Sequence, residues 1–453
     1  MTAGLTLALA EQGASLDWDD LPDDVVELAR QCLLDWLAVT LAGSSEPAAR
    51  IALSVTLEDE PGTVGATVVG THVRLTAPAA ALVNGTASHA LDYDDANTSM
   101  VGHPTVPLLG ALLPVAEKRH SSGAELLTAF VAGYETECRL GRAVGLPHYR
   151  QGFHATGTIG AIGAAAACAR LLGLDAYSTA AALGLAATQA GGLKCMFGTM
   201  AKPLHAGRAA ANGLLAARLA VAGFTANAQA LEASQGFIEA LGGSPDGEEL
   251  SAIREGWFIR RNLFKFHASC LETHSVIEGI QQLRAAHPLP VEAISRIVIH
   301  ANSLQLGMCA IPDPATGLEA KFSLRHLAAA AALGIDTSAV ACFSDDFACD
   351  SRLAEVRGRV EVVDDGPASG GTPVDIWLTD DRRLNVTYDT HGPATDLAAQ
   401  RRRLEDKAMA LATPVIGDRS GQLVDAAAHI SDSIDVRDLI ALTATSEVEG
   451  QHD

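Results

Sequence analysis

Three carboxylates and two imidazoles stand within one short stretch of the sequence, HALDYDDANTSMVGHPT at residues 89 to 105. The side chains concerned are His89, Asp92, Asp94, Asp95 and His103. Groups of this kind are costly to bury unless they are paired, and they are the side chains that bind metals or transfer protons near neutral pH. The stretch is therefore a metal site, an acid–base site or a polar loop between buried helices.

His103 stands directly before Pro104, a residue that suits the first turn of a helix. An imidazole at the positive end of a helix is favoured in its neutral form, which can act as a base. The nearby aspartates could orient this imidazole or hold a proton, because like charges so close together raise the pKa of one carboxyl group. The stretch lacks the glycine and the terminal glutamate of an EF-hand loop, so a calcium site of that kind is not expected.

A second segment, HYRQGFHATGT, supplies Tyr149 and His154 in front of another helical pattern. Acid–base chemistry needs at least two titratable groups, and His154 could be the second of them. The glycines of GTIGAIG, at 157 to 163, are three residues apart and match neither GxGxxG nor a P-loop. Their spacing is typical of closely packed helices, so no nucleotide is predicted, and no other cofactor is expected.

Basic side chains gather in the segment KCMFGTMAKPLHAGRAAANG. Lys202, His205 and Arg208 are three residues apart, which keeps them within one broad sector of a helix. Pro203 suits the first turn of that helix, so Lys202 stands at its N-terminal edge, where free backbone N–H groups favour an anion. Because the surrounding residues are apolar and unpaired cations are rarely buried, the cluster predicts a site for a substrate carboxylate.

The segment FKFHASCLETHS adds Lys265, Cys270 and His274. Cys270 and His274 are four residues apart and share a face if the segment is helical. A cysteine nucleophile would need a third residue to orient its base, and the spacing identifies none. A proton donor or acceptor is therefore the favoured role here.

The composition excludes several classes of partner. With 54 acidic and 32 basic residues, the 453-residue chain carries a formal net charge of −22, which opposes binding to nucleic acids and to anionic membranes. Its eight cysteines are scattered without a CxxC pair, as suits a reducing cytosol. No basic region precedes the N-terminal apolar residues, and the most apolar run, 159 to 174, contains Arg170 and is too short for a membrane span. We expect a cytoplasmic protein without nucleic-acid or membrane partners.

Helical patterns rich in Ala and Leu recur through the first half of the chain. They cover about 22 to 41, 78 to 90, 105 to 119, 122 to 145, 157 to 173, 177 to 189, 203 to 222 and 228 to 241. Most are apolar on several sides, which predicts an all-α domain, interrupted by one hairpin at 64 to 76.

The pattern changes after about residue 257. Alternating β-branched runs follow at 257 to 264, 294 to 301, 359 to 364, 374 to 379 and 382 to 389, with helical patterns at 272 to 287 and 321 to 333. The tail is helical again. We therefore expect a mainly α protein, in which residues 1–261 and 393–453 form a large all-helical domain and residues 262–392 form a smaller, inserted α+β domain.

The motifs HALDYDD…HPT, GFHATGT, GTMAKPLHAG, KFHASC…TH and LEAKFSL occur in an order that resembles the MmgE/PrpD family over about residues 20 to 390. The resemblance implies an all-helical domain with an inserted lid domain, usually in a homodimer. It also implies cofactor-free chemistry on small di- or tricarboxylates: 2-methylcitrate dehydration, cis-aconitate decarboxylation or iminodisuccinate epimerisation. By matching motif positions, the family's active site falls on Asp92, His103, His154, Lys202, Lys265 and His274.

Two positions depart from the decarboxylase branch of the family. This sequence has Ala96 and Cys270 where that branch has Thr and His, which argues against cis-aconitate decarboxylation. The epimerase branch is similar in keeping the cysteine and a tyrosine that corresponds to Tyr149.

These observations together predict a cofactor-independent lyase, a dehydratase or decarboxylase, that transfers a proton next to a carboxylate of its substrate. The residues expected to bind substrate carboxylates are Lys202, Lys265, His205 and Arg208. The residues expected to transfer protons are His103, oriented by Asp92, and His154, with Tyr149, Cys270 and His274 as further candidates. An epimerase of a related dicarboxylate is the main alternative. A metal-dependent hydrolase using His89, Asp92 and His103, and a binding protein without catalysis, are more remote ones.

Overall fold

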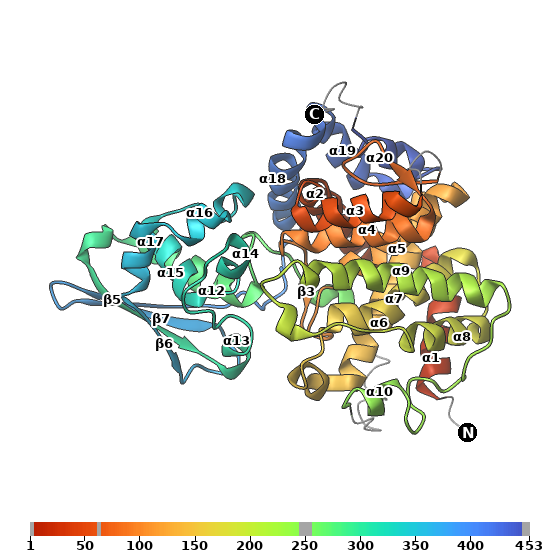
Figure 1. The fold of residues 1–453 in the computed structure, drawn as a ribbon, viewed down its shortest axis with the longest axis horizontal. Coiled ribbons are helices and arrows are strands. Elements are labelled where there is room, and N and C mark those ends of the chain that lie inside the picture. Colours follow the sequence, from red (N-terminus) through yellow and green to blue (C-terminus); the bar gives the residue numbers. More distant parts are fainter. Residues whose placement is uncertain (1–3, 61–64, 244–255, 446–453) are drawn as a thin grey trace.

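The computed structural model describes residues 4–60, 65–243 and 256–445 and is mainly helical. On the larger side lie α1 (Leu5–Ser15), α2 (Asp23–Gly43), α3 (Pro47–Asp59), α4 (Ala77–Ala90), α5 (Thr105–Arg119), α6 (Gly123–Arg150), α7 (Ala155–Leu172), α8 (Ala176–Ala187), α9 (Ala201–Val221), α10 (Phe237–Ala240), α18 (Leu397–Ile416), α19 (Arg419–Ala428) and α20 (Arg437–Ala441). On the smaller side lie α12 (Leu271–Ala286), α13 (Ser303–Leu306), α14 (Gly317–Ala320), α15 (Leu324–Leu333), α16 (Asp345–Ala348) and α17 (Ser351–Arg357) (Figure 1).

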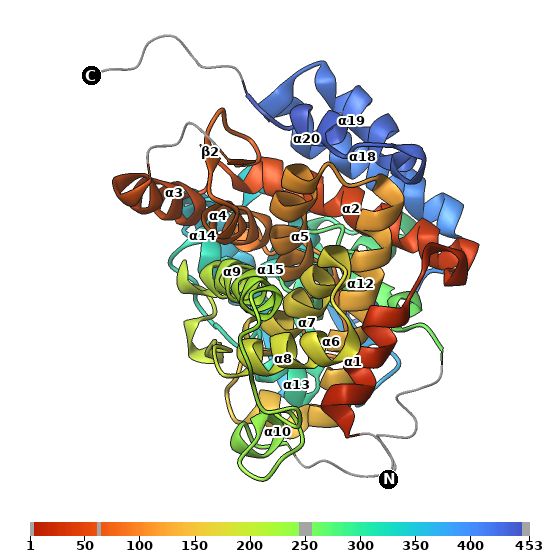
Figure 2. The same ribbon diagram turned by 90° about the vertical axis from the view of Figure 1, so that its right-hand side faces the viewer.

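The larger side joins the two ends of the chain. α2 is apolar at helical spacing and is buried along most of its length, in a core that it shares with α5, α6 and α18. A buried ion pair between Lys407 Nζ and Asp35 Oδ1, 2.6 Å apart, links α18 to α2. α7 lies in the middle of this side and packs against α5, α6, α8 and α9 (Figure 2).

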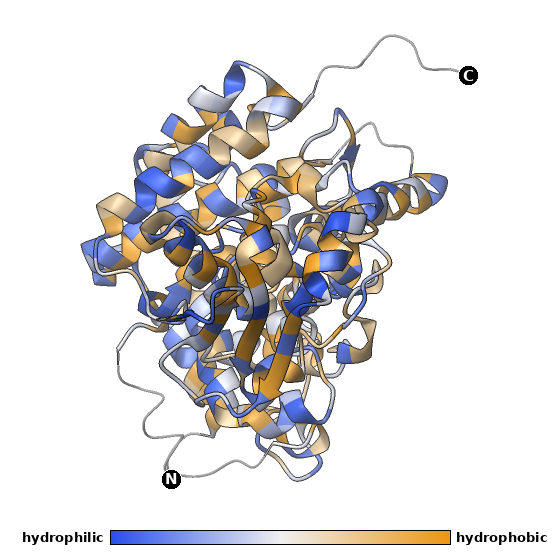
Figure 3. Ribbon diagram, turned by 90° about the vertical axis from the view of Figure 1, so that its left-hand side faces the viewer, coloured by the Kyte–Doolittle hydropathy of each residue, from blue (hydrophilic) through white to orange (hydrophobic). Residues whose placement is uncertain are grey.

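The smaller side is built on a four-stranded sheet. Its strands β5 (Ile294–Ala301), β6 (Val360–Asp364), β7 (Thr372–Leu378) and β8 (Arg383–Tyr388) stand in the order β6-β5-β7-β8. β5 pairs with β6 in parallel, and the other pairs are antiparallel. The inner strands are hydrophobic over most of their length (Figure 3), and they form a second core with α12, α15 and α17.

Two short pairings complete the strands. β1 (Ala66–Thr67) pairs with β2 (Arg74–Leu75), within the hairpin expected from the sequence, although Val64 of that pattern lies outside the described residues. β3 (Ala96–Asn97) pairs with β4 (Asn262–Leu263) and so fixes the loop after α4 against the chain that enters the smaller side.

The glycines of GTIGAIG serve close packing, as predicted. A Cβ added at Gly160 would lie 2.8 Å from Pro107 of α5, and one at Gly163 would lie 2.5 Å from the Glu137 side chain of α6. Larger residues on this face of α7 would therefore push α5 and α6 away.

The predicted elements agree with the structure in most of the chain. The helix predicted at 228 to 241 is wrong, since those residues form turns and only α10 is helical there. The strand predicted at 257 to 264 is mostly wrong as well, because a 3-10 turn occupies Phe258–Arg261 and only β4 is extended. Helices α1, α3, α13, α14, α16 and α17 were not predicted.

Within the described part of the chain, one helix is long and apolar enough to cross a membrane by length and composition alone. It is α7, and 89% of its residues are buried inside the structure. It therefore has the surroundings of a core helix.

Candidate active site

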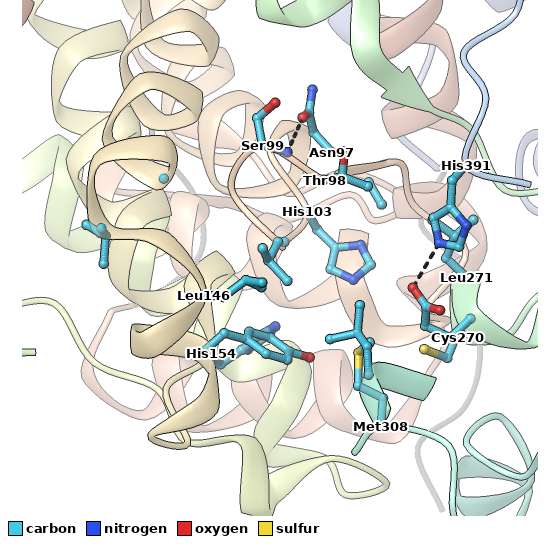
Figure 4. Close-up of a pocket in the computed structure, with 18 of the residues that line it drawn as sticks. Asn97, Thr98, Ser99, His103, Leu146, His154, Cys270, Leu271, Met308 and His391 are labelled. Atoms are coloured by element: carbon cyan, nitrogen blue, oxygen red, sulfur yellow. Dashed lines mark hydrogen bonds and ion pairs between the residues drawn. The ribbon is translucent and has the colours of Figure 1, made fainter. Parts of the chain in front are cut away.

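A cavity of about 630 Å³ opens where the larger side meets the smaller one (Figure 4). Its walls come from the loop 96–103, the C-terminal part of α6, the start of α12 and the segment around α13. Of the residues expected to act in the site, those that line it are His103, Tyr149, His154, Lys202 and Cys270. Chain segments more than 150 residues apart in sequence thus meet at one place.

Three buried lysines hold the loop that follows α4. Lys321 Nζ donates to the backbone oxygen of Leu91 at 2.6 Å, and Lys265 Nζ donates to that of Asp92 at 2.8 Å. Lys407 Nζ donates to the next oxygen, that of Tyr93, at 2.7 Å. Positive charge at the end of a helix is favourable, and here it satisfies carbonyls that the helix leaves unpaired.

Asp94 joins two histidines. Its Oδ2 lies 2.9 Å from His89 Nδ1 and 2.9 Å from His103 Nδ1. His103 Nδ1 also lies 2.8 Å from the backbone oxygen of Asp95. Both neighbours of this nitrogen can only accept, so Nδ1 carries a proton, and in the neutral ring Nε2 then keeps its lone pair. His103 is thereby held in the tautomer that acts as a base through Nε2.

Asp92 is an ion-pair centre. Its Oδ1 accepts from Lys202 Nζ at 2.8 Å and from Lys265 Nζ at 2.6 Å, while His103 Nε2 is 3.8 Å away. Burial raises the pKa of Asp92, but the two ammonium groups outweigh it and hold the pKa well below its usual value. The carboxylate that orients His103 is therefore Asp94, whereas we expected Asp92 in that role.

Asp92 also has an unusual backbone. Its φ is +52°, in the left-handed region that non-glycine residues rarely adopt. Such strain persists only where the surroundings fix the conformation, and here Lys265 holds both the backbone oxygen and the side chain.

The lysines make this site positive inside an acidic protein. Lys202, Lys265 and Lys321 bring three ammonium groups to a cluster whose carboxylates include Asp92 and Asp94, while Glu272 lines the cavity beside it. Burial lowers the pKa of Lys321 to about 8, so this lysine is mostly charged at neutral pH. Among these groups Lys202 lines the cavity, where its ammonium group can attract an anion from solvent.

Lys202 reaches the cavity from the first turn of α9. Its Nζ lies 5.3 Å from the ring centre of Phe197 and 5.1 Å from that of Phe322, and both rings line the cavity. The aromatic faces and Asp92 fix the position of the ammonium group.

His154 is held by a second histidine. Its Nδ1 lies 3.0 Å from His205 Nδ1, so one of the two nitrogens must carry the proton. Burial lowers the pKa of both imidazoles, which favours the neutral forms. The ring of His154 packs edge-on against Phe197, with ring centres 5.0 Å apart.

Four residues expected at the substrate lie elsewhere. Lys265 is fully buried and bonded to Asp92, behind the cavity wall, and His205 contacts His154. Arg208 is exposed and donates to Asn212. His274 is buried and lines a different, smaller pocket next to Tyr388, with its Nε2 3.3 Å from the backbone oxygen of Ser269.

The cavity has further polar residues that the sequence did not point to. His391 Nε2 lies 3.0 Å from Glu272 Oε1 on one wall, as Figure 4 shows, and Arg142 is exposed on another. Glu272 stands between Cys270 and His274 in a motif already singled out, so its position could have been noticed. Lys321 lies in LEAKFSL, whereas no pattern marks His391 or Arg142.

The aspartate–histidine cluster also meets the distance requirement for a metal site. One ligand atom each from His89, Asp92, Asp94 and His103 lies within 4.8 Å of the others. However, Asp92 Oδ1 already accepts from two ammonium groups, and Asp94 Oδ2 already accepts from two imidazoles. A cation at this place would have to displace Lys202 and Lys265, so the residues fit an ion-pair network better than a metal.

The sequence matches two family models in turn. Residues 8–249 match the MmgE/PrpD N-terminal domain, and residues 267–430 match the MmgE/PrpD C-terminal domain. The chain belongs to the MmgE/PrpD family. This membership agrees with the resemblance carried by the motifs.

Relatives within the MmgE/PrpD family carry decarboxylase names. The cis-aconitate decarboxylase-like protein oryM of Aspergillus oryzae is 33% identical over 301 residues, which are 63% of this chain and 62% of the relative. The cis-aconitate decarboxylase of Aspergillus terreus is 31% identical over 63% of this chain and 61% of its own length. The cis-aconitate decarboxylase of Homo sapiens is 30% identical over 73% of this chain and 70% of its own length. The match thus spans less than two thirds of the fungal relatives.

Proposed function

We propose that this chain is a cofactor-independent lyase that acts on a small di- or tricarboxylate by proton transfer at a carbon next to a carboxylate. One observation carries the proposal: His103 lines the cavity, and its Nδ1 lies 2.8 Å from the backbone oxygen of Asp95 and 2.9 Å from Asp94 Oδ2, which favours a base with its free nitrogen at Nε2. The names of the relatives support a lyase of this family.

The positive site explains why the substrate would be a carboxylate. Removing a proton next to a carboxylate creates a carbanion, which is too unstable unless cations neutralise the adjacent charge. Lys202 stands on the cavity wall at the start of α9, where free N–H groups add to its charge. We assign it to the carboxylate beside the reacting carbon. Lys265 and Lys321 lie behind the cavity wall and offset the negative charge of Asp92.

The two histidines supply the proton steps. In a dehydration, His103 Nε2 takes a proton from carbon and passes it to the leaving hydroxyl, which departs as water, while neutral His154 donates a hydrogen bond to that hydroxyl. In a decarboxylation, the electron pair of the broken carbon–carbon bond stays on carbon as CO₂ leaves, and a histidine returns a proton to that carbon. His205 would set the proton position on His154, so that the neutral ring offers a donor to the cavity.

We further propose that residues 262–392 form an inserted α+β lid domain over a helical domain of residues 1–261 and 393–453. The separate hydrophobic cores support two units, although the core of the larger side extends to Ala268 and that of the smaller side begins at Cys270, which favours a first boundary near these residues. Walls from both sides support the role of a lid. On the family resemblance, we expect a homodimer in the cytoplasm.

An epimerase is the second candidate. Tyr149 and Cys270 both line the cavity, and Cys270 lies on the other side of His103 from His154 (Figure 4). An epimerase needs two groups that face one carbon from opposite sides, and the positions of His154 and Cys270 support this alternative.

A panel of acids tests these proposals. The protein would be incubated in D₂O with citrate-, aconitate- and succinate-like acids and followed by NMR. We expect a new alkene or evolved CO₂ from at least one acid, with loss of that activity in the His103→Gln variant. Deuterium exchange without a change of skeleton would instead establish the epimerase. If no acid changes and no deuterium enters, the proposed function fails.

A further inference from the structure

We propose that the cavity has an apolar subsite beside the charged one, and that the substrate carries an aliphatic chain which occupies it. This inference rests on the proposed function, because the chain would extend from the carboxylate head held near Lys202. The subsite is formed by Val101, Leu146, Leu304 and Met308, all of which line the cavity.

The volume is the first observation. At about 30 Å³ for each water-sized group, a cavity of about 630 Å³ holds roughly twenty such groups. A six-carbon tricarboxylate has only about a dozen non-hydrogen atoms, and those are bonded more closely than waters. A cavity of this size falls in the range, about 300 to 1,000 Å³, that takes larger organic ligands. The charged head alone would leave much of it unfilled.

The exposed aliphatic side chains are the second observation. Leu146 at the C-terminal end of α6 is 42% exposed, and Leu304 in α13 is 36% exposed. Leu146 belongs to the larger side of the molecule and Leu304 to the smaller side, and half-buried Met308 lines the same cavity. Water on large aliphatic groups is unfavourable, so a ligand with an apolar chain would gain free energy by covering both walls.

The backbone of Val101 is the third observation. Its φ is +51°, and a β-branched residue in this region is an outlier where glycine would be free of strain. Gly102 stands next to it with an ordinary conformation. Strain kept at a binding site calls for a local role, and the isopropyl group of Val101 lines the cavity two residues before the proposed base.

Binding of unreactive probes tests the subsite without any need for turnover. Dissociation constants of succinate and its methyl, ethyl, propyl and butyl derivatives would be measured by titration calorimetry. We expect the constant to fall by about three- to fourfold for each added methylene. A constant that stays level or rises with chain length overturns the inference, while the acid panel in D₂O still decides the proposed function on its own.

Two variants and a control assign the effect to the named walls. Val101→Gly should keep or raise the melting temperature, because glycine adopts this φ freely. It should also reduce the gain in binding affinity for each added methylene to below about twofold. Leu146→Asn should reduce it in the same way. Leu215→Asn, at an exposed position of α9 away from the cavity, should keep the wild-type gain.

The same variants exclude a competing occupant. If a second copy of the chain covers these side chains, Leu146→Asn would shift the sedimentation of the protein toward the monomer and leave the gain per methylene unchanged. That result would overturn the inference. An unchanged sedimentation with a smaller gain supports it.

Discussion

Replacing Asp94 by asparagine removes the charge that stabilises a proton on His103. In the structure the carboxylate Oδ2 is 2.9 Å from His103 Nδ1. His103 should keep its tautomer in the variant, because the backbone oxygen of Asp95 still accepts from Nδ1 at 2.8 Å. The base therefore remains in place, and what is lost is the attraction between Asp94 and the imidazolium that forms during the reaction.

The size of the loss follows from the distance. Opposite unit charges about 4 Å apart attract by about 4 kcal/mol at an effective dielectric constant of 20, and the neighbouring lysines offset part of this. A loss of about 2 to 4 kcal/mol corresponds to a decrease of about 30- to 1,000-fold in kcat. KM should change little, because Lys202 and its contacts are untouched. Steady-state kinetics on the acid that the panel identifies would measure both constants.

Asp95→Asn is the matched control in the same loop. Burial raises the pKa of Asp95 to about 7, so the carboxyl is largely protonated at pH 6 and an amide resembles it. At that pH the control should keep kcat within about threefold of the wild type. If Asp94→Asn also stays within that limit, or if both variants lose the same activity, Asp94 does not stabilise the charge on His103.

Four further outcomes are expected. The pKa of Asp95 is raised from its unfolded value to about 7, so the contribution of its protonated carboxyl to stability is full below about pH 4 and is lost as the pH rises through 7. In denaturant unfolding at pH 8, Asp95→Asn should therefore be more stable than the wild type by up to about 4 kcal/mol. Equal stability of the two proteins would contradict this expectation. His205→Ala should lower kcat about tenfold with little change in KM, because His154 loses its hydrogen-bond partner. His205→Asn should recover part of the lost kcat, because its amide can replace Nδ1 of His205. Equal rates for the two variants would argue against a hydrogen-bonding role. Calorimetric affinity for succinate should weaken above about pH 8 as Lys321 loses its proton, and a constant affinity from pH 7 to 9 would show that Lys321 does not act on the anion. Prolonged treatment with a chelator should leave activity unchanged, and a loss restored by a divalent ion would favour the metal alternative.

The sequence predicted most long helices because their apolar residues recur at helical spacing, as in α2 and α5. Turns at 228 to 241 were mistaken for a helix because their alanines and leucines have the same spacing. The roles of Asp92 and Asp94 could not be separated, since three aspartates within four residues look alike until the backbone turns. Lys265 and Lys202 carry the same charge in sequence and are both buried, and only the structure shows that Lys202 lines the cavity while Lys265 does not.

The proton position on His103 is the most direct test of the proposed chemistry. Protein labelled with ¹⁵N-histidine would be studied by long-range ¹H–¹⁵N NMR near neutral pH. The signals of the His103 ring are those that are missing from the spectrum of the His103→Gln variant. We expect a proton on Nδ1 and a bare Nε2, as the contacts with Asp94 and Asp95 require. A neutral ring with its proton on Nε2 would leave no base facing the cavity and would contradict the mechanism.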